Sequence, residues 1–311
     1  MLPVHQYMEQ TKRYNHLNEY LKNKFGERTL KICVDGGFTC PNRDGKIGTG
    51  GCIFCSERGS GDHIDSTLSI KKQVEEYFKS YRAKRANKFI VYFQNYTNTY
   101  DSIENLKKKY DAALIDDRIV GIAIATRPDC INEEIAQLIK SYSNKYYVWV
   151  ELGLQTSNDH IGKIINRGYN TRQFSRAVDI LNKYNIDVVA HIMVGLPNET
   201  KNDIKNTVKF INNSKIVGIK IHSTYIVKNT ILENMYLNGE YTPITLEYYL
   251  DCLTYIITHI NSNIVIHRIS GDAPKDLLIA PDWNLHKKWI LNGFEKILKN
   301  ENLFQGKYYS N

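Results

Sequence analysis

The chain has 311 residues, 42% apolar and 24% charged, which is typical of a folded globular protein with one large domain or a domain with an appendage. It carries 41 lysine and arginine residues against 33 aspartate and glutamate residues, so its net charge is +8. No apolar run approaches the roughly 18 residues of a membrane span, and the polar segment Met1 to Lys12 has no signal-peptide core, which predicts a cytoplasmic protein without a membrane partner.

Short runs rich in valine, isoleucine and tyrosine recur along the chain, with helical patterns between them. The predicted strands are Thr29–Val34, Phe89–Phe93, Val120–Ala125, Tyr147–Leu152, Asp187–Met193 and Val217–Ser223. The predicted helices are Ile70–Arg85, Ile103–Leu114, Asn132–Tyr142, Asn158–Ile165, Thr171–Tyr184 and Thr200–Asn212. A regular alternation of strands and helices indicates parallel βα units.

Strands such as Tyr147–Leu152 are apolar along most of their length, as expected for a parallel sheet that is covered on both faces or closed into a barrel. The fold class predicted is therefore α/β, a partial (β/α)6 TIM-like barrel. Beyond the barrel we expect a helix near Thr245–Ile260, a strand at Ile264–Ile269 and a helix near Leu285–Lys299. The predicted parts are a basic helical segment at 1–28, the barrel at 29–230 and a C-terminal α/β extension at 231–311 that closes or covers the barrel.

Three of the six cysteines, Cys40, Cys52 and Cys55, lie in one glycine-rich loop after the first predicted strand. Three thiolates in such a loop suit an iron–sulfur cluster, and a four-iron cluster with three cysteine ligands leaves one iron open to a small molecule. A zinc site completed by Cys33 or His63 is an alternative, although Cys33 lies within a predicted strand and is expected to be a small core residue. A redox pair of Cys52 and Cys55 is a further alternative.

Polar residues gather at the ends of the predicted strands, and in a parallel barrel these ends meet at one rim. They are Gln94, Asn95 and Tyr96 after the second strand, Thr126 to Asp129 after the third, Glu151 and Gln155 around the end of the fourth, His191 and Met193 on the fifth, and Lys220 and His222 on the sixth. Any one of them could merely terminate its strand. Because the cysteine loop follows the first strand, the whole set predicts a site at this rim.

The segment from Phe38 to Cys55 resembles the cluster-binding loop of radical S-adenosylmethionine (SAM) enzymes, whose usual signature is C-x3-C-x-aromatic-C. Phe54 fits the aromatic position, whereas the first gap spans residues 41–51 and is similar to that of the branch related to the catalytic subunit of Elongator. Further segments similar to that branch are Thr126-Arg-Pro-Asp129, Glu151-Leu-Gly-Leu-Gln155, Arg167-Gly168 before an aromatic residue, and His191-Ile-Met-Val-Gly-Leu-Pro197. The chain most resembles the small bacterial YtqA/YhcC-like group.

The resemblance implies a [4Fe–4S] cluster on Cys40, Cys52 and Cys55, with SAM on its open iron and reductive cleavage of SAM to a 5′-deoxyadenosyl radical. It implies cofactor contacts from Phe54, Gln94, Asn95, Thr126, Glu151, Gln155, Arg167, His191 and Met193. Arg167 would suit the carboxylate of SAM, because a guanidinium group can form two parallel hydrogen bonds with a carboxylate. Met193 would flank the adenine of SAM. An ordinary packing or ion-pair role is the alternative for each residue.

Three residues are candidates for action on a substrate. Cys130 follows the third strand and could return a hydrogen atom to a substrate radical, or it could be a buried thiol. Lys220 and His222 would face the barrel mouth and could bind a substrate phosphate or carboxylate. Cys252 falls within a helical pattern and is expected in the core.

Basic residues cluster at Lys12-Arg13, Lys22/Lys24/Arg28, Arg82/Lys84/Arg85/Lys88, Lys107–Lys109 and Lys287-Lys288. Each cluster could be a solvated helix face, or together they could meet a polyanion. With the Elongator-like segments, they favour a radical SAM enzyme that modifies tRNA at the side chain of a wobble uridine and draws electrons from a flavodoxin or ferredoxin. The alternatives are a radical SAM enzyme for a small metabolite or a protein, and a zinc-stabilised RNA-binding module without catalysis.

Overall fold

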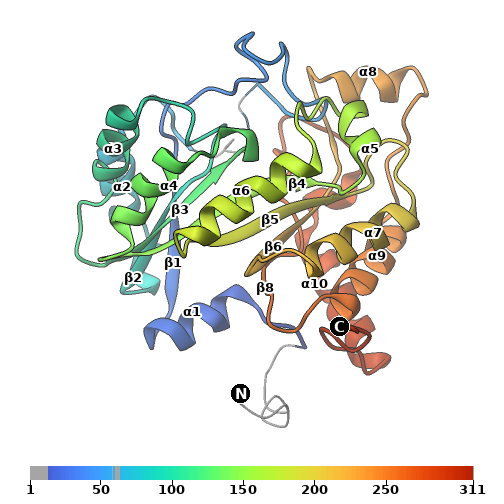
Figure 1. The fold of residues 1–311 in the computed structure, drawn as a ribbon. Coiled ribbons are helices and arrows are strands. Elements are labelled where there is room, and N and C mark those ends of the chain that lie inside the picture. Colours follow the sequence, from blue (N-terminus) through green and yellow to red (C-terminus); the bar gives the residue numbers. More distant parts are fainter. Residues whose placement is uncertain (1–12, 58, 60–63, 311) are drawn as a thin grey trace.

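The computed structural model describes residues 13–57, 59 and 64–310, and its main sheet has seven parallel strands (Figure 1). In spatial order these strands are β1 (Thr29–Val34), β2 (Lys88–Phe93), β3 (Ile119–Thr126), β4 (Tyr147–Gln155), β5 (Asp187–Val194), β6 (Gly218–Ser223) and β8 (Val265–Arg268). The sheet curls into a partial TIM-like barrel, so the predicted fold class is confirmed. The C-terminal region adds β8 beside β6, which makes it the seventh strand of the barrel.

Helices follow the strands and pack on the outer side of the sheet (Figure 1). They are α2 (Ile70–Lys79), α3 (Ile103–Asp111), α4 (Glu133–Tyr142), α6 (Thr171–Lys183), α7 (Lys201–Asn212), α9 (Leu246–His259) and α10 (Lys287–Asn300). The short helix α5 (Asp159–Ile164) instead packs in a separate apolar cluster with Ile53 of the cysteine loop. Side chains cap several of them, for example Asn132 on the backbone N–H of Ile135. The helix predicted at Ile70–Arg85 instead ends at Lys79, because Ser80 is extended and a separate 3-10 turn, η2 (Ala83–Arg85), follows.

Smaller elements complete the rim of the barrel. The short strands β7 (Ile226–Val227) and β9 (Leu278–Ala280) pair antiparallel. The helix α8 (Ile231–Leu237) and the 3-10 turns η3 (Pro128–Cys130) and η4 (Asp282–Leu285) lie in the connections. No helix in the part of the chain that the structure describes is long and apolar enough to cross a membrane.

Successive residues of each strand serve two different environments, because side chains alternate across a sheet. On β4, Val148, Val150 and Leu152 belong to the large core under the outer helices. Trp149, between them, belongs to a second apolar cluster inside the barrel, and Glu151 lines a pocket above it. The strands are therefore apolar toward the helices and change from apolar to polar along their inner faces.

The helix α1 (Leu17–Phe25) closes the inner cluster from below (Figure 1). Its buried residues Leu17 and Leu21 pack against inward residues of the sheet such as Ile90 and Trp149. The stretch from Met1 to Lys12, the first part of the predicted basic segment, lies outside the described residues. Because α1 fills the lower interior, the space that remains inside the barrel opens at the C-terminal ends of the strands.

Candidate functional site

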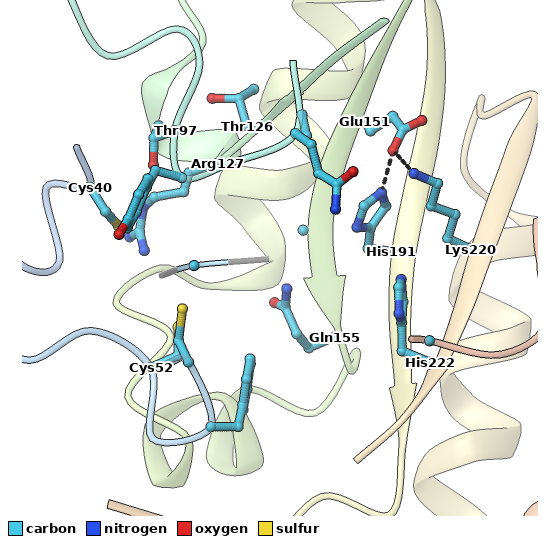
Figure 2. Close-up of a pocket in the computed structure, with 18 of the residues that line it drawn as sticks. Cys40, Cys52, Thr97, Thr126, Arg127, Glu151, Gln155, His191, Lys220 and His222 are labelled. Atoms are coloured by element: carbon cyan, nitrogen blue, oxygen red, sulfur yellow. Dashed lines mark hydrogen bonds and ion pairs between the residues drawn. The ribbon is translucent and has the colours of Figure 1, made fainter. Parts of the chain in front are cut away.

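A pocket at the C-terminal ends of the strands brings together residues from the cysteine loop and from all seven strands or their ends. Eleven of the fifteen residues proposed from the sequence to hold the metal, the cofactor or the substrate line it: Cys40, Cys52, Phe54, Cys55, Gln94, Thr126, Glu151, Gln155, His191, Lys220 and His222. Figure 2 shows Cys40 and Cys52 on one side, Glu151, His191, Lys220 and His222 on the other, and Gln155 between them. The pocket thus has a cysteine end and a strand end.

The cysteine loop is tied to the rim by side chains that bond to backbone groups. Asn42 donates its Nδ2 to the carbonyl oxygen of Asn166 over 2.6 Å, and Asn166 donates its own Nδ2 to the carbonyl oxygen of Gly51 over 2.8 Å. Arg43 donates to the carbonyl oxygen of Cys55 over 2.8 Å. Gly51 has a left-handed φ of +78°, which favours glycine at this position of the loop. These bonds position the loop through its backbone.

The three loop cysteines influence one another electrostatically. Burial, together with the charges of Cys55 and Cys40, raises the pKa of Cys52 to about 12, and Arg127 acts in the opposite direction. The three half-buried cysteines would repel one another as thiolates unless a shared cation neutralised them, and metal binding deprotonates thiols. The donor set therefore fits an iron–sulfur cluster held by Cys40, Cys52 and Cys55.

A fixed positive charge lies beside the cysteines. Nε and Nη2 of Arg127 donate to the two carboxylate oxygens of Asp129 at 3.0 and 2.9 Å, and Nη1 donates to the carbonyl oxygen of Arg167 at 3.0 Å. Burial alone would lower the pKa of Arg127, but the pairing with Asp129 outweighs it and the pKa is raised. The Thr-Arg-Pro-Asp segment thus keeps a charged guanidinium at the pocket wall.

Gln155 stands between the two ends of the pocket in an unusual backbone conformation. Its φ is +58°, a left-handed value that is uncommon outside glycine, and it lies where the pairing of β4 and β5 shifts register. The Tyr169 hydroxyl group donates to Oε1 of Gln155, and the two oxygens are 3.0 Å apart. Backbone strain of this kind is retained where the surrounding structure imposes it, often at functional sites.

Glu151 is the centre of a buried network at the strand end (Figure 2). Its carboxylate accepts hydrogen bonds from Trp149 Nε1 at 2.9 Å, from His191 Nε2 at 2.7 Å and from Lys220 Nζ, and Lys220 also donates to the Tyr92 hydroxyl at 3.0 Å. Burial alone would raise the pKa of Glu151, but Lys220 and His191 hold it well below its usual value. Burial lowers the pKa of Lys220 to about 7, with Glu151 opposing, and also lowers the pKa of His191. His191 is therefore a neutral donor at pH 7.

Four residues proposed from the sequence do not line the pocket as it is described. Asn95 is buried and donates to Asp35 at 2.6 Å. Arg167 is fully buried; its guanidinium donates to the carbonyl oxygens of Leu154, Thr156 and Tyr169 and to the Asp159 carboxylate. Met193 packs in an apolar cluster with Ile53 and Leu196 under the cysteine loop. Cys130 lies near enough to Cys40 for the charge of Cys40 to raise the pKa of Cys130. Arg167 thus holds the backbone after β4, and a direct contact with a bound carboxylate finds no support in its surroundings.

Sequence reasoning missed several charged and aromatic residues of the pocket wall, namely Lys31, Arg43, Tyr169 and Arg268. Side chains two positions apart on a strand lie on the same face of the sheet. Lys31 precedes Cys33 by two positions on β1, so this rule would have placed it on the same inward face as Cys33. Arg268 pairs with Lys220 in the β6–β8 register, but the sequence does not show that β8 joins this sheet.

The residues considered for a zinc site are not gathered in one place. The charged neighbours of Cys33 are Lys31, Lys220, Arg268 and Glu151, which belong to the strand end, and His63 lies outside the described residues. Within 13–57, 59 and 64–310, no group of three or more histidine, cysteine, aspartate or glutamate side chains is arranged to hold a single metal ion.

Sequence comparison settles the family. The profile of the Radical SAM superfamily matches residues 43–211, more than half of the chain, and that of the Radical_SAM C-terminal domain matches residues 216–300. The chain belongs to the radical SAM superfamily. The second match includes β8, in agreement with its place in the barrel.

Individual relatives locate the chain within the superfamily. The uncharacterized protein YtqA of Bacillus subtilis is 36% identical, and the match covers 97% of this chain and 95% of YtqA, which confirms the predicted small bacterial group. A tRNA uridine(34) acetyltransferase of Dehalococcoides mccartyi is 34% identical over 40% of this chain and 28% of its own length. The structure of Elp3 from Methanocaldococcus infernus matches 89% of this chain and 64% of that chain, with a TM-score of 0.66 and 18% identity, and so shares the fold.

Proposed function

We propose that this protein is a radical SAM enzyme that modifies tRNA at the side chain of a wobble uridine. The observation that carries the proposal is the local similarity to a tRNA uridine(34) acetyltransferase, in a chain whose net charge is +8. The similarity covers 28% of that relative, so the proposal concerns radical chemistry and does not include acetyl transfer. A positive net charge favours binding to a polyanion such as RNA.

The proposed cofactors are a [4Fe–4S] cluster on Cys40, Cys52 and Cys55 and SAM beside it. When bound, they would supply a radical that removes a hydrogen atom from the substrate. The protein residues would bind and orient: Gln155 and Thr126 lie in the pocket wall between the cysteine end and the strand end. Arg127 keeps a positive charge next to the cysteines. Glu151 and Lys220 are buried at the strand end, where their ion pair orients both side chains.

The proposed action of Lys220 and His222 is on the substrate, since both lie at the strand end, away from the cysteines (Figure 2). Cys130 stays a proposal as hydrogen-atom donor. Its thiol is largely buried, and burial together with Asp129 raises its pKa to about 12, so it is protonated at neutral pH and carries the S–H bond that such a donor needs.

Some basic residues lie near the cysteine end and are suited to contact RNA there. Lys109 lies over the ring of Phe38 at 3.8 Å, and Lys46 lies over the ring of Tyr100 at 5.0 Å. The clusters on α1 and around η2 lie instead toward the N-terminal ends of the strands (Figure 1). A tRNA on the pocket side would therefore meet only part of the positive charge.

The test compares modified nucleosides of tRNA from cells with and without the gene, complemented by wild type, Cys55→Ala or Cys252→Ala. We expect one uridine derivative to change in the deletion strain and to be restored by wild type and by Cys252→Ala, a buried cysteine on α9, but not by Cys55→Ala. An unchanged nucleoside profile, with SAM still cleaved by the purified protein, would reject tRNA and favour a small metabolite or a protein as substrate.

Two further parts of the proposal concern the setting of the reaction. A reduced flavodoxin or ferredoxin would provide the electron, and the protein would act in the cytoplasm. Reduction of the purified protein by each carrier, followed by measurement of 5′-deoxyadenosine, tests the first. Fractionation of cells tests the second.

A further inference from the structure

The strand end of the pocket carries more positive than negative charge. Lys31, Lys220 and Arg268 line it, against the carboxylates of Glu151 and Asp272. Glu151 accepts hydrogen bonds from three donors, and Asp272 pairs with Arg268 at 2.7 Å and with Lys287 at 2.9 Å. Lys31 has no ion pair among the described residues and lies 5.0 Å from the centre of the Tyr92 ring. The charge of Lys31 thus acts on Glu151 without a direct ion pair, and this end of the pocket has one cation more than it has carboxylates.

Unused hydrogen-bonding groups lie at the same end. Nε2 of His222 is buried and has no hydrogen-bond partner in the structure, although a buried polar atom normally has one. The ring of His222 stacks at a tilt on that of His191, with centroids 5.4 Å apart, so Glu151 fixes it indirectly through His191. Arg268 uses Nη2 for Asp272, and its other N–H groups make no bond within the described part of the chain.

The electrostatic effect of this arrangement is visible in His222 itself. Burial holds its pKa well below 6.5, and the neighbouring His191 ring and the positive charges of Arg268 and Lys220 lower it further, with only Glu151 opposing. A place where surrounding cations oppose protonation of a histidine is also one where an anion is stabilised. Charge and free donors therefore point to the same kind of ligand.

We propose that His222, Arg268 and Lys31 form a receptor for an oxyanion of the substrate, a phosphate or a carboxylate, at the end of the pocket opposite the cysteines. This inference rests on the proposed function, in which a nucleotide enters the pocket, and adds the group by which it is held. Guanidinium binds both kinds of oxyanion through two N–H groups. The Glu151 network below would fix the floor of the receptor, because its members are already hydrogen-bonded to one another.

The experiment is calorimetric titration of the anaerobically purified full chain with inorganic phosphate and, separately, with acetate, using chloride at equal ionic strength as the reference. We expect saturable binding of at least one oxyanion to the wild type, weakened roughly tenfold or more in Arg268→Gln and in His222→Gln. The matched control is Arg118→Gln, which removes an exposed arginine that pairs with Asp116 far from the pocket, and it should bind as the wild type does. Circular dichroism and melting temperatures of the variants exclude unfolding as the cause.

Further arms of the titration separate the possible sources of the oxyanion. Preference for phosphate identifies a nucleotide phosphate as the bound group, and preference for acetate identifies a carboxylate substituent; both support the receptor. Loss of binding in the presence of saturating SAM would show that the site belongs to the cofactor and would overturn the inference, as would equal binding by the wild type and Arg268→Gln. If oxyanion binding is as expected but tRNA nucleosides are unchanged in the deletion strain, only the tRNA substrate is rejected. Changed nucleosides without oxyanion binding reject only the receptor.

Discussion

The cysteine end and the strand end of the pocket are held in place by different means. At the cysteine end, side chains of a loop bond to backbone carbonyl groups, as Asn42 does with Asn166. At the strand end, side chains from neighbouring strands bond to one another, as Glu151 on β4 does with His191 on β5 and Lys220 on β6. Loop residues can therefore change locally, whereas a change at the strand end alters several strands at once.

The comparison predicts the largest loss of stability from Glu151→Gln. The substitution removes the carboxylate that neutralises Lys220, and breaking a buried ion pair on one side costs about 3–5 kcal/mol. Chemical unfolding should show this loss. The double variant Glu151→Gln with Lys220→Met should recover much of it, because the unpaired charge is gone. Equal stability of the single and double variants would contradict the account.

At the cysteine end, Asn42→Ala should have a smaller effect on stability and a clear effect on the loop. It leaves the part-buried carbonyl group of Asn166 without its donor, which costs roughly 1 kcal/mol. We expect lower iron and sulfide content after reconstitution, measured per protein. Asn18→Ala on α1 is the control, since it changes an exposed asparagine far from the loop. Full iron content in Asn42→Ala would show that the loop does not depend on this contact.

A pH dependence is expected in the turn after β5, where a glutamate side chain meets loop backbone. Glu199 accepts hydrogen bonds from the N–H groups of Gly195 at 2.7 Å and Leu196 at 3.3 Å, and burial raises its pKa from 4.5 to about 8. Because the folded-state pKa is the higher one, this group's contribution to stability is complete below pH 4.5 and is lost as the pH rises through about 8. Glu199→Gln should flatten the fall in melting temperature between pH 6 and about 9. An unchanged slope would contradict the raised pKa.

The smallest effect is expected from Gln155→Asn, which tests the residue between the two ends. Asparagine tolerates the left-handed conformation better than glutamine does, so stability should stay within about 1 kcal/mol of the wild type or rise slightly. The shorter side chain no longer reaches Tyr169, which should weaken SAM binding in equilibrium dialysis. Gln137→Asn on the exposed face of α4 should leave SAM binding unchanged. Unaltered SAM affinity in Gln155→Asn would remove Gln155 from the cofactor contacts.

Most of the barrel could be predicted because its signals are local. Apolar strands at regular spacing and capped helices gave all seven strands within a few residues. The seventh, β8, was expected as a strand, but its partner could not be read from the sequence because pairing depends on a contact between residues distant in the chain, Val217 and Val265. The end of α2 at Lys79 was missed since Ser80 carries no strong helix-stop signal.

The site was predicted unevenly for the same reason. Cys40, Cys52 and Cys55 stand out by spacing within one loop. Arg167 stands out by its motif, yet its guanidinium is buried among carbonyl groups, and only the fold determines this. Lys31 gives no motif and reaches the pocket only because α1 and the curled sheet leave space above it.

By itself, the sequence determined the alternation of strands and helices, the position of the three cysteines and the positive net charge, because each depends on neighbouring residues or on simple totals. The tertiary structure decided which polar side chains share one pocket and which are used up in internal bonds. Glu151, Lys220 and His191 are distant in the chain, and they meet only because parallel pairing brings β4, β5 and β6 into register.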